Sequence, residues 1–171
     1  EKFTKICKKY HLFLVEDAAQ AHGSSFKGRK LGSFGKINAF SFYPTKNLGC
    51  FGDGGAIVTN SGNLAKICRQ IRDYGQKEKY IHKRYGLNSR LDEIQAAILR
   101  YKLKKLDRYI KIREQIAKNY MQMLKNTPFT LPSIHPKANH TYYQFVCKIS
   151  KERDNFLKFM ESNGIKLAIY Y

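Results

Sequence analysis

The stretch from Phe40 to Gly55, which reads FSFYPTKNLGCFGDGG, constrains the fold of this chain more than any other. Its aromatic start favours a β-strand over residues 39–43, and Pro44 has no backbone donor with which to continue that strand. Glycines follow at positions 49, 52, 54 and 55, so Lys46 stands where a buried strand breaks into a glycine-rich turn. A buried ammonium is costly unless it is paired or neutralised, and a lysine held in such a place can serve as a nucleophile. The alternative is an ordinary lysine at a strand end that reaches solvent.

A second strand is predicted upstream, at the apolar run of residues 12–15 (LFLV). A run that is apolar on both faces is typical of a central strand in a covered parallel sheet. Asp17 would then lie at the carboxyl end of that strand, which is the edge where open α/β sheets bind ligands, and Gln20 follows closely. A carboxylate, an amide and a lysine suit pyridoxal phosphate. The carboxylate can keep the pyridine nitrogen protonated, and the lysine can carry the aldehyde as a Schiff base and then move protons.

Four short motifs in this order resemble the pyridoxal-phosphate-dependent nucleotide-sugar aminotransferases (the DegT/DnrJ/EryC1/StrS family). They are DAAQ at 17–20, SFYPTKNLG at 41–49, GDGGA at 52–56 and NSRLD at 88–92. The resemblance covers essentially all 171 residues and implies an α/β, aspartate aminotransferase-like fold (pyridoxal-phosphate fold type I). Residues 1–127 would form part of its three-layer αβα large domain and the following helices, and residues 128–171 the beginning of a smaller α+β C-terminal domain. We therefore expect a longer parent chain, truncated here at both ends.

The resemblance also implies roles for individual residues. Lys46 would be the catalytic Schiff-base lysine and general acid/base, and Asp17 would pair with the pyridine nitrogen of the cofactor. Gln20 would hydrogen-bond the 3′-oxygen of the cofactor, and Ser41 would bind its phosphate. Each has a plainer alternative, such as a turn-capping aspartate or a surface amide.

Two further site residues are implied near the start of a predicted helix. Asn88 resembles the residue that reaches the cofactor phosphate from a neighbouring subunit, and Arg90 the residue that holds the carboxylate of the amino donor. Helix capping and salt bridges are the alternative roles. If the family pattern holds, the protein is a homodimer with shared active sites. His22 is predicted to be structural.

The charge of the chain invites a different interpretation, since 32 Lys and Arg against 13 Asp and Glu give a net charge of +19. The charge is mostly lysine, spread from Lys2 to Lys166 without an arginine-rich block, so we expect no nucleic-acid partner. A basic surface could instead attract a sugar diphosphate. The four cysteines and five histidines lack the spacing of disulfide or metal sites, so we expect free thiols, no metal and a cytoplasmic location. No apolar run is long enough for a membrane span.

Hydrophobic periodicity predicts the remaining elements. Helices are expected at residues 1–10, 63–74 with Gly75 as the residue after its cap, 89–125 with a break near 103–107, and 152–162. Ser89 would open a capping box for the third of these helices. Strands are expected at residues 12–15, 39–43, 56–59, 142–149 and 165–170. Residues 23–35 would be a loop or small hairpin, residues 76–87 an ordered surface loop, and Pro128, Pro132 and Pro136 would mark a linker.

The leading hypothesis is transamination of a nucleotide-linked ketosugar, with glutamate as the amino donor, in the synthesis of cell-surface polysaccharides or glycoconjugates. Residues 72–75, 79–80 and 85–88 most resemble enzymes that act at C3 of dTDP-linked 3-keto-6-deoxyhexoses. C4 aminotransferases of UDP- or GDP-linked sugars, a non-catalytic regulatory relative that binds pyridoxal phosphate, and a basic nucleic-acid-binding protein remain alternatives. A related sugar dehydratase carries histidine in place of the lysine, and Lys46 argues against it.

Overall fold

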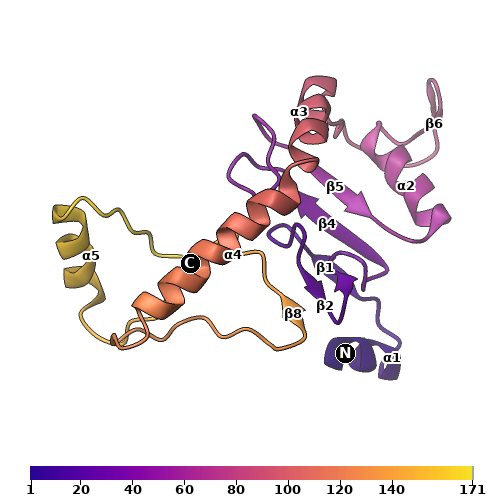
Figure 1. Ribbon diagram of the computed structural model, residues 1–171. Coiled ribbons are helices and arrows are strands. Elements are labelled where there is room, and N and C mark those ends of the chain that lie inside the picture. The colour runs from indigo at the N-terminus through magenta and orange to yellow at the C-terminus, as the bar shows by residue number, and fades with distance from the viewer. Residues whose placement is uncertain (171) are drawn as a thin grey trace.

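A three-stranded sheet in the order β1–β4–β5 lies at the centre of the computed structural model, which describes residues 1–170 (Figure 1). β1 (Val15–Asp17) runs parallel to β4 (Ile37–Ser41), and β5 (Gly55–Val58) runs antiparallel to β4. Because β1 and β4 are parallel, their carboxyl ends meet at one edge of the sheet. The predictions that Asp17 ends a strand and that two further strands flank the glycine turn are confirmed.

The first strand begins three residues later than predicted. Its pairing with β4 starts at Val15, opposite Ile37, so most of the apolar run at 12–15 lies before the ladder. Leu12 is 58% exposed and Phe13 is 73% exposed, and β1 is an edge strand among the described residues. The prediction of a covered central strand at 12–15 is therefore wrong for this chain, because no second neighbour pairs with β1 here.

The N-terminal helix and the small hairpin are confirmed. α1 spans Lys2–Lys9, and β2 (Ser25–Phe26) pairs antiparallel with β3 (Arg29–Lys30). A strand that the sequence did not predict, β8 (Ala138–Asn139), pairs with the other side of β2. The hairpin therefore joins the first part of the chain to a segment more than a hundred residues later.

The region after β5 contains a helix and a hairpin. α2 spans Gly62–Arg72. Its N-cap is Ser61, whose side chain accepts a hydrogen bond from the backbone amide of Leu64, and its C-cap is Asp73. Tyr74 is the next residue and has a positive φ, so Gly75 stands one position later than predicted. Residues 76–87 were predicted to be a loop, but they contain a hairpin of β6 (Gln76–Glu78) and β7 (Ile81–His82).

Two helices cover the middle of the chain, with the break where the length argument placed it. α3 is Glu93–Leu103 and α4 is Leu106–Met123 (Figure 1). The predicted capping box at Ser89 is wrong. The N-cap is Asp92, and the backbone amide of Ser89 instead donates to the carbonyl of Arg72.

The C-terminal part has one helix of its own, α5 (Arg153–Ser162), which lies apart from the sheet in Figure 1. The predicted strands at 142–149 and 165–170 are wrong, since the structure shows only an isolated bridge between Thr130 and Lys148 in this region. The alternating pattern of 142–149 reflects a segment that packs on the earlier part of the chain, described below. The proposed division at residues 127 and 128 stays a prediction, and Tyr171 lies outside the described residues.

The core lies directly under the glycine turn. It consists of Leu48, Cys50, Leu99, Leu106 and Ile110, with Phe42 and Leu91 packed against it. Two of these residues come from the turn that carries Lys46 and three come from α3 and α4. The burial of these apolar side chains, at about 25 cal/mol per Å², holds the turn against the helices. Over residues 1–170, no helix combines the length and the apolar character that a membrane crossing requires.

Candidate active site

Asp17 reaches the edge of the sheet because its neighbour anchors the strand. Side chains alternate along a strand, so Glu16 and Asp17 lie on opposite sides of β1. The Glu16 carboxylate accepts hydrogen bonds from the backbone amides of Gly32 (2.9 Å), Phe34 and Gly35 (2.7 Å). Asp17 itself accepts from the amide of Ala19 through Oδ1 (3.0 Å) and remains exposed. Its second carboxylate oxygen has no partner among the described residues and is free to meet a ligand.

Lys46 lies in a tight turn that is held from below by α3. A Cβ on Gly49 would come within 2.6 Å of the carbonyl oxygens of Tyr43 and Pro44, so only glycine fits there. Lys102 Nζ donates to the carbonyl of Gly49 (2.6 Å). The ammonium of half-buried Lys46 lies 4.6 Å from the ring centroid of Tyr143, a residue ninety-seven positions later.

A cavity of about 340 Å³ lies between the carboxyl end of β1 and the segment 140–146. One wall is made by Asp17, Gln20 and Ser24, and the other by Thr141, Tyr143 and Gln144. Ser24 Oγ and Thr141 Oγ1 lie 2.9 Å apart in a buried hydrogen bond that closes the far end.

The turn that carries Lys46 is also bonded to the second wall. Thr45 Oγ1 lies 3.0 Å from the Tyr143 hydroxyl, and Asn47 Nδ2 donates to the carbonyl of Thr141 (3.1 Å). Lys46 is thus flanked on both sides by residues that bond to the cavity wall. The sequence did not indicate Thr141, Tyr143 or Gln144, because their part in the site depends on contacts between distant segments.

His22 is a buried titratable group beside this site. It is 4% exposed, its ring lies 5.3 Å from that of Phe40 and 5.9 Å from that of Phe42, and neither ring nitrogen has a well-formed hydrogen bond. Burial, and after it the positive charge of Lys46, lower the pKa of His22, while the nearby Ser41 backbone opposes this effect. Burial therefore favours the neutral form of the imidazole.

The remaining predicted site residues are less closely gathered. Ser41 ends β4, and its hydroxyl accepts from the amide of Tyr43 (3.2 Å). Asn88 and Arg90 are exposed, do not line the cavity, and bond to each other through Arg90 Nε and Asn88 Oδ1 (3.2 Å). One chain therefore brings together Asp17, Gln20 and, through Tyr143, Lys46, but it leaves Asn88 and Arg90 elsewhere.

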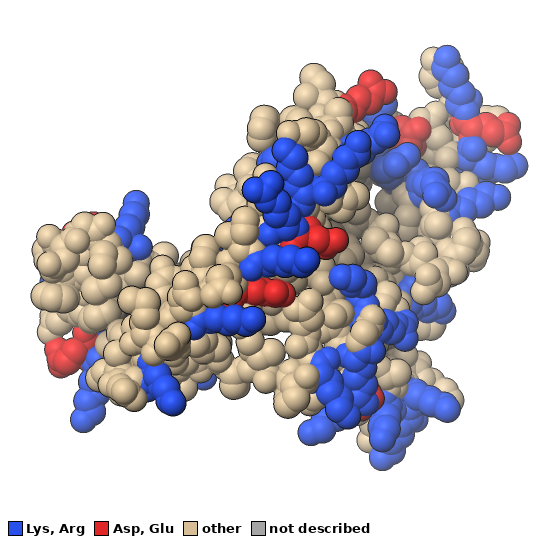
Figure 2. All heavy atoms as spheres, in the orientation of Figure 1, with Lys and Arg blue, Asp and Glu red and all other residues tan. Residues whose placement is uncertain are grey.

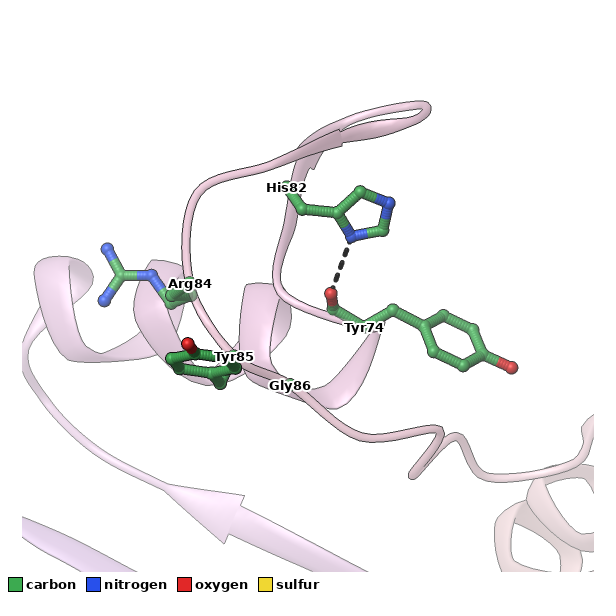
Figure 3. Close-up of a pocket in the computed structure, with 5 residues that line it drawn as sticks. All are labelled: Tyr74, His82, Arg84, Tyr85 and Gly86. Carbon is green, nitrogen blue, oxygen red and sulfur yellow. Dashed lines mark hydrogen bonds between the residues drawn. The ribbon is translucent and has the colours of Figure 1, made fainter.

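A second cavity, of about 490 Å³, lies at the β6–β7 hairpin (Figure 3). His82 Nδ1 is bonded to the carbonyl of Tyr74 (2.8 Å), and Arg84 and Tyr74 point in opposite directions. No predicted site residue lines this cavity, and its polar groups do not converge on one point.

Figure 2 shows lysine and arginine side chains dispersed over this face of the molecule with few acidic groups among them.

The smaller cavity suits pyridoxal phosphate on the chemistry of its walls. Gln144 lines the cavity, and its buried Nε2 has no hydrogen-bond partner among the described residues. Because buried polar groups are normally hydrogen-bonded, this donor is available to a ligand in the cavity. Asp17 supplies a carboxylate, Gln20 an amide and Lys46 an amine nearby. No group of three or more His, Cys, Asp or Glu side chains among residues 1–170 is arranged to bind a metal.

Comparison with known proteins identifies the family. The family model described as "DegT/DnrJ/EryC1/StrS aminotransferase family" matches residues 1–171. A dTDP-3-amino-3,4,6-trideoxy-alpha-D-glucose transaminase from Streptomyces venezuelae is 42% identical over 98% of this chain and 44% of its own length. A dTDP-3-amino-3,6-dideoxy-alpha-D-galactopyranose transaminase from Aneurinibacillus thermoaerophilus is 44% identical over 100% of this chain and 47% of its own length.

A solved structure extends this likeness to the fold. An aminotransferase of the same family from Brucella abortus superposes with a TM-score of 0.95 at 37% identity, over 99% of this chain and 45% of that chain. The predicted α/β, aspartate aminotransferase-like fold and the predicted family are thus confirmed. The chain spans less than half the length of these relatives.

Proposed function

The chain belongs to the DegT/DnrJ/EryC1/StrS aminotransferase family, and we propose that the complete protein transfers an amino group to a nucleotide-linked ketosugar with pyridoxal phosphate as cofactor. The observation that carries this proposal is the cavity in which Asp17 and Gln20 face Tyr143, whose ring contacts the Lys46 ammonium. A carboxylate that lines a cavity, and an amine that lies against the ring of a residue on the opposite wall, are what this chemistry needs.

The cofactor, when bound, supplies an aldehyde that condenses with amines and a ring that accepts an electron pair. Asp17 would hold a proton on the ring nitrogen through its free carboxylate oxygen, and Gln20 would bind the ring 3′-oxygen. Ser41 would donate its hydroxyl to the phosphate. Lys46 Nζ would bind the aldehyde carbon between turnovers, and as a free amine it would move the proton between the donor carbon and the cofactor.

For the substrate, we propose a dTDP-linked 3-keto-6-deoxyhexose, with glutamate as the amino donor. The names of the relatives from Streptomyces venezuelae and Aneurinibacillus thermoaerophilus support a dTDP sugar aminated at C3. The net charge of +19 favours an anionic substrate such as a sugar diphosphate. We place the enzyme in the cytoplasm, which agrees with the free thiols of all four cysteines.

The proposal includes a homodimer, because Asn88 and Arg90 lie outside the cavity of their own chain. Both are exposed on the segment that leads into α3, where a second subunit can reach them. Asn88 would meet the cofactor phosphate, and Arg90 the carboxylate of the amino donor, in the site of the partner.

The test is to load the complete protein with pyridoxal phosphate, reduce it with borohydride and locate the fixed cofactor by mass spectrometry. We expect it on Lys46, and we expect the Lys46→Ala variant to lose both the fixed cofactor and transamination. The matched control is Lys36→Ala, which removes a lysine whose ammonium lies over Phe13, outside the cavity. Cofactor fixed on another lysine would refute the assignment.

A panel of dTDP-, UDP- and GDP-linked ketosugars, with glutamate consumption as the readout, tests the substrate. We expect turnover with dTDP-linked 3-keto sugars. Turnover with 4-keto sugars alone would make the enzyme a C4 aminotransferase. Fixed cofactor on Lys46 without turnover of any sugar would favour the non-catalytic regulatory relative.

A further inference from the structure

Tyr143 stands in an unusual position relative to Lys46. It follows Lys46 by ninety-seven residues, yet the ring centroid of Tyr143 lies 4.6 Å from Lys46 Nζ, and its hydroxyl lies 3.0 Å from the hydroxyl of Thr45, the residue before the lysine. The ring is therefore fixed at its polar tip and faces the ammonium. Tyr143 also lines the cavity that contains Asp17 and Gln20.

The surroundings of the ammonium leave the ring as its main partner. No carboxylate of the described residues forms a salt bridge with Lys46. His22 is buried, and burial, followed by the positive charge of Lys46, lowers its pKa, so a second positive charge beside Lys46 is unfavourable. An aromatic face attracts an ammonium, and the attraction grows as solvent is excluded.

The backbone around Tyr143 is held as well. Arg113 Nη1 of α4 donates to the carbonyl of Tyr142 (3.2 Å), and Asn47 Nδ2 donates to the carbonyl of Thr141. The segment that carries the ring is thus tied to α4 on one side and to the Lys46 turn on the other. A ring fixed in this way can position a flexible lysine, since the lysine has four rotatable side-chain bonds and the ring has two.

We propose that Tyr143 is a positioning residue for Lys46, whose free ammonium rests on the face of the Tyr143 ring and is thereby kept next to the cavity that Tyr143 lines. This inference rests on the proposed function, in which Lys46 must return to the same place after each transfer. The ring face does the holding, and the backbone bonds at Thr141 and Tyr142 keep the ring in place even without its hydroxyl.

The test measures Lys46 itself, in the complete protein freed of cofactor. Each lysine is acetylated with a small reagent at fixed pH, and the rates are read by mass spectrometry. Tyr143→Leu removes the π-face but keeps apolar cover, and we expect Lys46 to react between about threefold and thirtyfold faster, the range given by a cation–π attraction at a partly to fully desolvated site. Tyr143→Phe keeps the face, so its Lys46 rate should stay within about twofold of wild type.

Lys9 and Tyr10 provide the matched control. The Lys9 ammonium lies 5.2 Å from the Tyr10 ring on the surface of the molecule. Tyr10→Leu should leave the Lys46 rate unchanged and alter the Lys9 rate by less than about threefold, because an exposed cation–π pair is weak.

A spectroscopic readout makes the test independent of whether the Tyr143 variants fold. In the wild-type protein, reductive ¹³C-methylation of lysines should give a Lys46 methyl signal shifted upfield by the Tyr143 ring current, and its absence from Lys46→Arg distinguishes it from the shifted signals of lysines over other rings, such as Lys36 and Lys105. An unshifted Lys46 signal, or equal Lys46 rates in Tyr143→Leu and wild type, would overturn the inference. So would a Tyr143→Phe rate as high as that of Tyr143→Leu, which would assign the holding to the hydroxyl.

Failure here is distinct from failure of the proposed function. Borohydride fixation of the cofactor on Lys46 requires no particular role for Tyr143, and the acetylation rates are measured without cofactor. An unchanged Lys46 rate together with normal fixation on Lys46 would remove only the positioning role. Fixation of the cofactor on a different lysine would refute the proposed function of Lys46, and the contact between Lys46 and Tyr143 could still be measured by the acetylation rates.

Discussion

Replacement of Glu16 by alanine is expected both to destabilise the protein and to weaken the binding of pyridoxal phosphate at the candidate site. The Glu16 carboxylate accepts from three backbone amides, of Gly32 and Gly35 at 2.9 and 2.7 Å and of Phe34 between them. These bonds fasten the loop at 32–35 to β1, in which Asp17 is the next residue. Without them, both the loop and the orientation of Asp17 lose their support.

The magnitude follows from the number and the burial of these bonds. Hydrogen bonds to a charged group contribute about 1.5–3 kcal/mol each, and water entering the vacated space recovers part of this. Gly32 and Gly35 are buried, and a Cβ on Gly35 would lie 2.8 Å from the carbonyl of Leu14, so the loop has little room to rearrange. We expect Glu16→Ala to lower the free energy of unfolding by roughly 3–5 kcal/mol.

Glu16→Gln separates the bonds from the bulk of the side chain. The amide keeps one oxygen, which can still accept from two amides, but its NH₂ group faces the amide of Gly32. We therefore expect about half the loss seen for alanine. The control is Glu161→Ala on the exposed surface of α5, which should change stability by less than about 0.5 kcal/mol.

Urea unfolding of the complete protein, followed by circular dichroism with and without pyridoxal phosphate, measures these differences. A Glu16→Ala variant within about 1 kcal/mol of wild type would refute the reasoning, because at least two of the three amides would then have found equal partners elsewhere. Equal losses for alanine and glutamine would also contradict it, since the remaining amide oxygen would then contribute nothing.

Three further predictions concern the site. Asp17→Asn should lower turnover far more than cofactor affinity, as measured by steady-state kinetics and absorbance titration, because a neutral amide cannot hold the ring nitrogen protonated. The pKa of His22 is lowered in the folded state, so the contribution of His22 to stability is full above about pH 6.5, the ordinary histidine value, and is lost as pH falls below it. Denaturant unfolding measured across pH should therefore show a smaller loss of stability at low pH for His22→Gln than for wild type. His140, whose pKa burial also lowers, is present in both proteins and contributes equally to both. Lys46→Ala and Arg90→Ala proteins, each inactive alone, should regain partial activity when mixed and allowed to exchange subunits, and exchange without recovery would place both residues in one chain's site.

The sequence predicted those parts of the site that depend on local patterns. Asp17 follows an apolar run, and Lys46 stands between Pro44 and Gly49, so both could be assigned to strand ends from their neighbours alone. Periodicity likewise placed the break between α3 and α4. These features need only a few adjacent residues to be recognised.

The second wall of the cavity could not be predicted in this way. The alternation of residues 142–149 favoured a strand, but Tyr143 contacts Lys46 and Thr45, and its neighbours bond to α4 and to the Lys46 turn instead of to a sheet. The hairpin at 76–82 has no alternating pattern, and its register includes an irregularity between Gln76 and Glu78. Both cases depend on pairings that local propensity does not encode.

α3 connects the two halves of the proposed shared site. At its C-terminal end, Lys102 Nζ donates to the carbonyl of Gly49 and lies 4.7 Å from the ring of Phe51, and near its start Gln95 Oε1 accepts from the amide of Phe51 (2.7 Å). Leu91, next to Arg90, packs on the core beneath the same turn. The segment that would reach a partner and the turn that carries Lys46 are thus attached to one helix. Because packed cores resist small displacements, a subunit that docks at Arg90 would meet a lysine turn already held in place.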